Sequence, residues 1–231
     1  MQKFTLVIEL KSDTLPGSGE GFGAVIDQDV VFDELGLPWI PAKRIKGLLR
    51  ESYEEIYELL NGKTSLPDSN SIFGKPGQEV EAPLYISNLY LEDYENLKKD
   101  LSQIESKFPS VFSTEAVLSQ FTYTRQQTAI DSKSGTAAAH SLRTIRVIKK
   151  GLVFKGEITY SGNISNFQHI LAIACLNLRR IGSKRTRGFG EIDCHLKDGK
   201  GAGLSEDALS WLKNIDNKSN PVQSETPNNN G

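Results

Sequence analysis

The residues best suited to chemistry in this chain lie in one glycine-rich segment, Arg179–Glu191, which carries five basic residues and no acid before Glu191. Its glycines permit positive φ angles and let a ligand approach the backbone closely. Consecutive N–H groups in such a turn form a concave site for an anion. Arginine and lysine side chains would neutralise phosphates there, and Phe189 would offer a ring on which a base stacks.

This combination favours a nucleic-acid strand as the ligand. The alternative is a solvated basic loop that joins a helix to a strand. The residues that we predict to contact RNA in this segment are Gly182, Ser183, Lys184, Arg185, Arg187, Gly188, Phe189 and Gly190.

A second group of cations lies near the start of a helix predicted over residues 41–60. Pro41 suits the first turn of a helix, and apolar residues then recur at helical spacing. Lys43 and Lys46 share one face by their three-residue spacing, and N–H groups at a helix N-terminus favour phosphate. We predict that Lys43, Arg44 and Lys46 bind RNA. The alternative is a surface helix whose cations pair with nearby glutamates.

Two aspartates and one histidine are candidates for RNA cleavage. Asp27 and Asp29 alternate along a predicted extended segment, so both carboxylates would face one side. A carboxylate beside bound RNA could hold a hydrated divalent metal ion and help activate a ribose 2′-OH. The alternative is that these aspartates accept hydrogen bonds from nearby backbone N–H groups. His140 could act as a general acid or base without a metal, or could be an ordinary surface histidine.

The bulk composition excludes several classes of protein. The chain has 231 residues and a formal net charge of -2, which allow one large domain or two small ones. Its two cysteines, Cys175 and Cys194, are too few for a disulfide framework or a metal cluster. No apolar run approaches the length of a membrane span, and the sequence begins without a signal peptide. We therefore expect a cytoplasmic protein without a membrane partner.

Charge is distributed unevenly along the chain. Acids predominate from Glu51 to Glu115, whereas bases predominate from Arg125 to Lys155. This asymmetry indicates a directional anion-binding surface, although solvated faces that balance one another would give the same pattern.

Hydrophobic periodicity predicts an α+β fold. Alternating patterns predict strands over 4–10, 84–91, 116–125, 144–148, 152–160 and 189–196, and helical spacing predicts helices over 41–60, 92–108, 167–180 and 204–215. The order strand–helix–strand, twice, fits a ferredoxin-like fold similar to the RNA-recognition motif, with a glycine-rich loop and a long polar excursion over residues 126–141 between likely strands. We expect one such domain over residues 1–196. Residues 197–231 would form a polar, partly disordered tail or linker.

Three segments together resemble the RAMP (repeat-associated mysterious protein) superfamily of CRISPR effector complexes, type III in particular. They are Gly21–Asp27 with Leu37–Gly47, Gln127–Asp131 with Gly135–Ala137, and Ile181–Glu191. The resemblance implies a ferredoxin-like fold that binds guide RNA along its backbone. It also implies a protruding hairpin insertion at about residues 120–150, in which Arg125–Arg146 forms the thumb that wedges between nucleotides, with Arg125, Arg143 and Arg146 as RNA-binding cations.

Within this family, an aspartate after the first strand cuts target RNA in backbone subunits, and Asp27 matches that position. Backbone subunits usually carry Gly-Ser-Ser before a Lys-Gly pair, whereas this chain has Ala42-Lys43-Arg44 there. The variant looks closer to the type III-D capping subunit, which puts cleavage by Asp27 in doubt. Relatives of that subunit are often longer, so the chain could be part of a longer or divided protein.

The resemblance thus implies a structural subunit that binds guide RNA, with target RNA and other effector subunits as partners. Binding without catalysis would need no cofactor. One alternative is an endoribonuclease that uses Asp27 and Mg²⁺, and a further alternative is a scaffold that binds an acidic protein.

Overall fold

The computed structural model describes residues 1–17, 26–60, 66–75, 82–128, 136 and 141–219, and for residues 215–219 it describes the backbone alone. The strands are β1 (Gln2–Leu10), β2 (Trp39–Ile40), β3 (Leu84–Ile86), β4 (Leu89–Leu91), β5 (Thr122–Gln127), β6 (Arg143–Ile148), β7 (Val153–Tyr160) and β8 (Ile192–Asp198). The helices are α1 (Ala42–Leu60), α2 (Ser69–Phe73), α3 (Tyr94–Lys107), α4 (Thr114–Phe121), α5 (Phe167–Asn177) and α6 (Ser205–Ser219), with a 3-10 turn at Arg185–Arg187.

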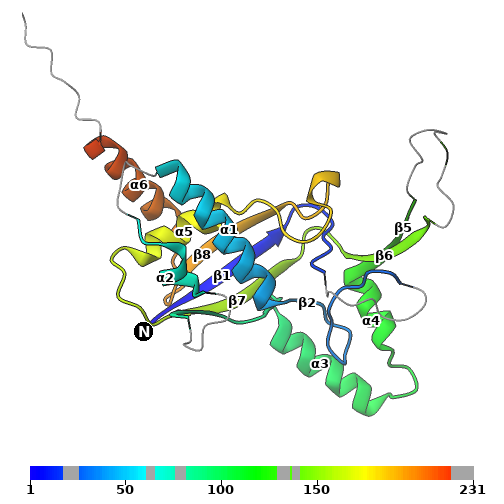
Figure 1. Ribbon diagram of the computed structural model, residues 1–231. Helices are drawn as coiled ribbons and strands as arrows, with labels where there is room; N and C mark the ends of the chain where they lie inside the picture. Colours follow the sequence, from blue (N-terminus) through cyan, green and yellow to red (C-terminus); the bar gives the residue numbers. More distant parts are fainter. Residues whose placement is uncertain (18–25, 61–65, 76–81, 129–135, 137–140, 220–231) are drawn as a thin grey trace, which may run out of the picture.

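The main sheet has the strand order β2-β4-β7-β1-β8, and β3 also pairs with β7 (Figure 1). Every pairing in it is antiparallel, and Leu6 in the centre of β1 lies opposite Gly156 on one side and Leu196 on the other. When β3 and β4 are taken together as the second strand, the order becomes 4-1-3-2, with α1 and α5 as the two crossover helices. The sequence prediction of a ferredoxin-like α+β fold is therefore confirmed.

The core lies between this sheet and helices α1 and α5. Every second side chain of β1 is buried, from Phe4 to Leu10, because alternate residues of a strand share a face. Helix α5 is apolar nearly all round and is buried along most of its length. The Ser52 hydroxyl of α1 donates a 2.8 Å hydrogen bond to the Ala174 carbonyl of α5, which fixes the two helices to each other.

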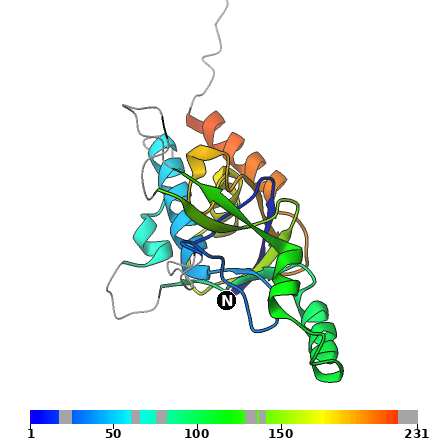
Figure 2. The ribbon, with the colours of Figure 1, turned by 90° about the vertical axis from the view of Figure 1, so that its right-hand side faces the viewer.

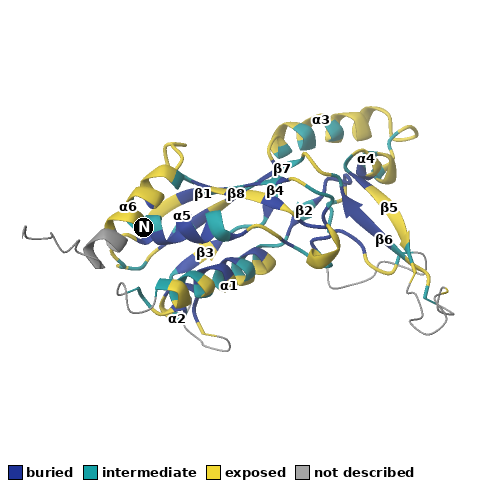
Figure 3. Ribbon diagram, turned by 90° about the horizontal axis from the view of Figure 1, so that it is seen from above, coloured by how far each residue is buried: buried dark blue, intermediate teal, exposed yellow. Residues whose placement is uncertain are grey.

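Strands β5 and β6 form a separate two-stranded ladder that projects from the main sheet (Figures 1 and 2). Its last described pair is Gln127 with Arg143. The base of the ladder is joined to the rest of the protein by bridges from Thr14 to Ile148 and from Gln28 to Ile145. Strand β6 is mostly buried, whereas β5 is mostly exposed (Figure 3). The expected insertion at about 120–150 includes residues 129–135 and 137–140, which lie outside the described residues.

Two sequence predictions of strands were wrong in part. Residues 84–91 form two short strands, because Ser87 and Asn88 turn their side chains to other elements: the Ser87 hydroxyl accepts the Glu157 N–H, and the Asn88 amide oxygen accepts the Ala42 N–H. The predicted strand over 116–125 begins as helix α4, because the Ser113 hydroxyl caps that helix by accepting the Ala116 N–H at 3.3 Å.

Other boundaries also differ from the predictions. Helix α2 was not among the predicted helices; the Asp68 side chain caps it by accepting the Asn70 N–H. The segment of Asp27 and Asp29, which was predicted to be extended, forms no strand over its described residues 26–32 and makes isolated bridges at Gln28 and Phe32. Beyond residue 196, Leu204 and Ala208 belong to the core, so α6 packs as part of the domain. Residues 220–231 lie outside the description.

Candidate functional site

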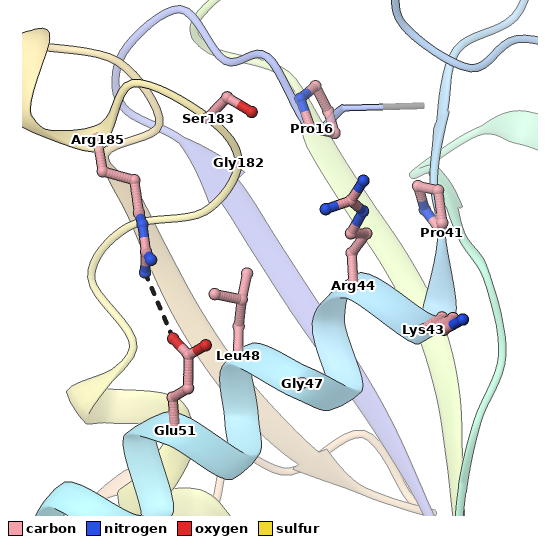
Figure 4. Close-up of a pocket in the computed structure, with 10 residues that line it drawn as sticks. All are labelled: Pro16, Pro41, Lys43, Arg44, Gly47, Leu48, Glu51, Gly182, Ser183 and Arg185. Atoms are coloured by element: carbon pink, nitrogen blue, oxygen red, sulfur yellow. Dashed lines mark ion pairs between the residues drawn. The ribbon is translucent and has the colours of Figure 1, made fainter. Parts of the chain in front are cut away.

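A groove of about 640 Å³ lies between the first half of α1 and the glycine-rich loop that precedes β8 (Figure 4). It is lined by Pro16, Pro41, Lys43, Arg44, Gly47, Leu48, Glu51, Gly182, Ser183 and Arg185. The two basic segments that the sequence analysis singled out are far apart along the chain, and the fold brings them together as the walls of this groove.

The glycine-rich loop is held in place by backbone hydrogen bonds to the segment after β1. The Ser183 N–H donates to the Leu15 carbonyl at 2.9 Å, and the Gly190 N–H donates to the Asp13 carbonyl at 3.0 Å. Gly182 has a φ of +81°, and a Cβ added there would lie 2.2 Å from the Leu15 oxygen. Only glycine therefore permits the loop to approach this segment so closely.

The cations of the groove come from both walls. Lys43 and Arg44 on α1 are exposed, and Arg44 extends across the groove toward Pro16 (Figure 4). Arg185 reaches from the loop toward α1, where its Nη1 lies 3.6 Å from Oε2 of Glu51. Such a concave site with exposed guanidinium groups on two sides suits a phosphate chain, because arginine offers several donors in a fixed plane.

The first turn of α1 contributes less than the sequence suggested. The Ala42 N–H already donates to the Asn88 side chain at 2.9 Å, and the Arg44 N–H donates to the Pro41 carbonyl at 3.0 Å. The expectation that free N–H groups at this helix N-terminus bind phosphate is therefore wrong for these two groups. The side chains of Lys43 and Arg44 remain exposed at the groove.

A second cluster of cations lies on the hairpin side of the same loop. Lys184 adopts a left-handed backbone conformation, with φ of 62°, and its ammonium contacts the Gln127 side chain of β5. Burial lowers the pKa of Lys184, and the nearby charges of Arg187 and Arg143 lower it further, whereas Asp27 raises it. Charged residues from three parts of the chain are thus close enough to Lys184 to influence its charge.

Phe189 does not offer an open stacking surface. Its side chain is 5% exposed, and the guanidinium of Arg125 lies over its ring with 5.0 Å between the Arg125 Cζ and the ring centroid. The prediction that a base stacks on Phe189 is therefore wrong. The ring instead anchors Arg125, which is exposed on β5, against the glycine-rich loop. Beside it, Gly188 has open space around its Cα.

Two predicted RNA contacts point away from the groove. Arg146 is 7% exposed, and its guanidinium forms ion pairs with Asp29 at 3.1 Å and with Glu115 at 2.8 Å. Lys46 donates to the Leu84 carbonyl at 2.9 Å, and burial lowers the pKa of its ammonium group. The structure therefore corrects both predictions, because these cations are used inside the protein. The apolar neighbours of Arg146 in β6 were a sequence signal of its burial.

The two aspartates do not share a face. Asp29 is 3% exposed, whereas Asp27 is exposed and pairs with the start of β6: its N–H donates to the Thr144 carbonyl at 2.9 Å, and its Oδ2 accepts the Thr144 N–H at 2.7 Å. The segment is irregular, so strand alternation does not apply. Within the described residues, no group of three or more histidines, cysteines, aspartates and glutamates is placed to hold a metal ion. His140 lies outside the described residues.

Several residues that line the groove were not predicted as parts of a site, among them Pro16, Gly47 and Leu48. Glu51 is one of the nearby glutamates that were expected only as ion-pair partners of the helix cations. Since the groove forms between elements that are distant in the sequence, no local pattern marked these residues as parts of one site.

Comparison with known proteins identifies the family of this chain. A model of the RAMP superfamily matches residues 7–193. The chain belongs to the RAMP superfamily. No match was found among curated proteins.

The fold of this RAMP protein also resembles that of chains in two solved structures. One is described as "Type III-B Cmr-beta Cryo-EM structure of the Apo state", with a TM-score of 0.60, 14% identity, and coverage of 86% of this chain and 98% of that one. The other is described as "Cryo-EM structure of the Type III-B Cmr-beta bound to cognate target RNA", with a TM-score of 0.61, 13% identity, and coverage of 90% and 99%.

At this level of identity the similarity establishes a shared fold. Both structures are type III-B, so the comparisons do not support the expected likeness to type III-D. In the described part of this RAMP protein, no helix combines the length and apolar character needed to cross a membrane.

Proposed function

We propose that this RAMP protein is a guide-RNA-binding structural subunit of a type III RNA-guided interference complex that acts in antiviral defence. The observation that carries the proposal is the groove between α1 and the glycine-rich loop, into which exposed cations project from both walls. Family membership and the likeness to chains of RNA-guided complexes support the same function.

The groove contains groups that recognise a strand by its backbone. Arg44 and Arg185 would bind phosphates, and the cluster of Arg143, Lys184 and Arg187 would continue the path toward the hairpin. Phosphate contacts position a strand without reading its bases, which suits a protein that carries guides of many sequences. Such binding needs no metal ion. Target RNA and the other subunits of the complex would be the remaining partners.

Removal of cations along the proposed RNA path is expected to weaken RNA binding and to reduce its dependence on salt. The variants are Arg44→Gln, on the α1 wall of the groove, and Arg187→Gln, in the cation cluster that continues the path toward the hairpin. Each lost phosphate contact should decrease the slope of log K against log salt by about 0.7, because fewer counterions are released from a single strand. Fluorescence anisotropy of a labelled guide RNA, measured with the full chain over a series of salt concentrations, gives this slope.

The control for this experiment is Lys99→Gln, which removes the same charge from an exposed position on α3, outside the groove. Equal losses in all three variants would show that only net charge matters, and this result would contradict the proposed site. An acidic protein partner is the competing interpretation of the loop. It predicts that a partner is retained on the protein and is not displaced by guide RNA.

A second candidate function, cleavage of target RNA, is favoured by the position of Asp27. Its carboxylate is exposed and lies close enough to Lys184 to raise the pKa of that side chain. An acid beside a predicted RNA path could hold Mg²⁺ and activate a 2′-OH. The bond from the Thr144 N–H occupies one of its oxygens, however, and gives Asp27 a structural role at the base of β6.

Asp27→Asn is expected to leave target cleavage by the assembled complex unchanged, because the proposed role is binding. The asparagine oxygen can still accept the Thr144 N–H, so the local structure should persist. The assay follows cleavage of a complementary RNA with and without magnesium, and Asp193→Asn, at an exposed position of β8, serves as the control. A loss of about 100-fold or more in Asp27→Asn alone would assign the cut to this chain.

The place of the subunit within its complex is also a proposal. Ala42-Lys43-Arg44, where backbone subunits carry Gly-Ser-Ser, favours a capping subunit at the end that holds the 5′ tag of the guide. A capping subunit would be present once in each complex, whereas a backbone subunit would be repeated. Native mass spectrometry of the purified complex counts the copies and decides between the two.

A further inference from the structure

The groove contains one acid, and this acid lies opposite an arginine. Among the ten described residues that line the groove, Glu51 is the only acidic one. It projects from the third turn of α1 and forms an ion pair with Arg185 across the groove, with 3.6 Å between Nη1 and Oε2 (Figure 4). A carboxylate at this position opposes an anionic ligand, so its presence in an RNA-binding groove requires an explanation.

The ion pair does not hold the loop in place. Both side chains remain substantially exposed, at 46% for Arg185 and 61% for Glu51, and exposed pairs at this separation contribute little to stability. The loop is instead fixed by backbone hydrogen bonds, such as that from Ser183 to Leu15, and by the Arg180 guanidinium, which donates to the Arg185 carbonyl. The pair therefore sets the direction of the Arg185 side chain without being needed for the fold.

We infer that Glu51 is an internal competitor for RNA: it occupies the Arg185 guanidinium in the free protein and must be displaced by a phosphate when RNA enters the groove. This inference rests on the proposed function of the groove. A phosphate is the stronger partner, because it offers several oxygens in the geometry of the guanidinium fork. Glu51 would also repel a phosphate that has not yet engaged Arg185.

This arrangement lowers the affinity of the groove for isolated anions more than its affinity for a long strand. A single phosphate must displace Glu51 from Arg185 without help from contacts elsewhere on the protein. A strand is already held by Arg44 and by the Lys184 cluster on the other side of the loop, so its effective local concentration helps to displace the carboxylate. Glu51 would thereby reduce occupation of the groove by short anions.

The test is Glu51→Gln, compared with Glu58→Gln, which removes an identical charge from an exposed position later in the same helix and outside the groove. The affinity of the full chain for labelled guide RNA should rise about 3- to 10-fold in Glu51→Gln, since the competing charge and its repulsion are both removed. Glu58→Gln should change it less than 2-fold or so. Binding of a labelled dinucleotide should improve by a larger factor than binding of the long guide.

An additional comparison separates this effect from general electrostatics. In an Arg185→Gln background, Glu51→Gln should produce a smaller gain than in the wild type, because the arginine that it occupies is gone. Equal gains in the two backgrounds, a gain equal to that of Glu58→Gln, or weaker binding in Glu51→Gln would overturn the inference. If the wild-type chain binds no RNA at low salt, the proposed function fails instead, so the two failures can be told apart.

Discussion

Gly182→Ala is expected to destabilise the protein by about 3 kcal/mol and to lower its melting temperature by about 6–12 °C. Gly182 has a φ of +81°, which L residues adopt only at a cost, and its added Cβ would lie 2.2 Å from the Leu15 carbonyl oxygen. The same oxygen accepts the Ser183 N–H. Relief of the clash would therefore move the loop wall of the groove and break this bond, so RNA affinity should fall as well.

Gly188→Ala is the matched control for this substitution. Gly188 also has a positive φ, of +79°, but an added Cβ would meet nothing within 4 Å. Gly188→Ala should lower the free energy of unfolding by about 1 kcal/mol, which reflects backbone strain alone. Thermal unfolding of the two variants measures the difference, and equal shifts in melting temperature would show that close contact at Leu15 is not what fixes the loop.

Arg146→Met is expected to cost about 3–5 kcal/mol, because it leaves the buried carboxylate of Asp29 without its cation. Asp29 is 3% exposed, and its Oδ1 lies 3.1 Å from the Arg146 Nε. Methionine preserves much of the apolar contact of the arginine stem, so the loss would come chiefly from the stranded charge. Chemical denaturation at neutral pH measures it.

The loss should depend on pH in a defined direction. Burial raises the pKa of Asp29 above its ordinary value, while the Val30 N–H and the Arg146 charge act against this rise. The folded protein therefore holds the Asp29 proton more tightly than the unfolded chain, and this group makes stability fall as pH increases through that interval. Removing the Arg146 charge raises the pKa of Asp29 further. The loss of stability in Arg146→Met should therefore be largest at about pH 7 and smallest at about pH 4.

Arg143→Met provides the control, since Arg143 is an exposed arginine of the same strand. Its effect on stability should stay within about 0.5 kcal/mol. A deficit in Arg146→Met that is the same at acidic and neutral pH would contradict the role given to Asp29, because protonation would then bring no relief.

The sequence predicted the elements with strong periodicity and located the basic segments, but it did not reveal how they meet. The alternation in β1 and the apolar spacing in α5 are local properties, and both elements formed where expected. Helix α4 was missed because a single cap at Ser113 outweighed a pattern that also suits a strand.

The orientation of individual side chains was harder to predict than the elements. Arg143 and Arg146 were both predicted to bind RNA, yet one is exposed and the other is buried against Asp29. That outcome depends on a partner more than a hundred residues away in the chain. Lys43 and Lys46 also differ, because Lys43 lines the groove whereas the Lys46 ammonium donates to the Leu84 carbonyl. A contact between residues that are far apart in the sequence cannot be predicted from the pattern of neighbouring residues.

The paired ends of the β5–β6 ladder have a consequence for how such chains can diversify. Gln127 and Arg143 lie opposite each other, so the chain leaves and re-enters the ladder at neighbouring positions. Because the entropy cost of closing a loop grows slowly with its length, a longer connection between these two positions should cost little stability. The described ladder itself remains tied to the glycine-rich loop, through the contact of Lys184 with Gln127 and of Arg125 with the Phe189 ring, so variation in length is expected only beyond the Gln127–Arg143 pair.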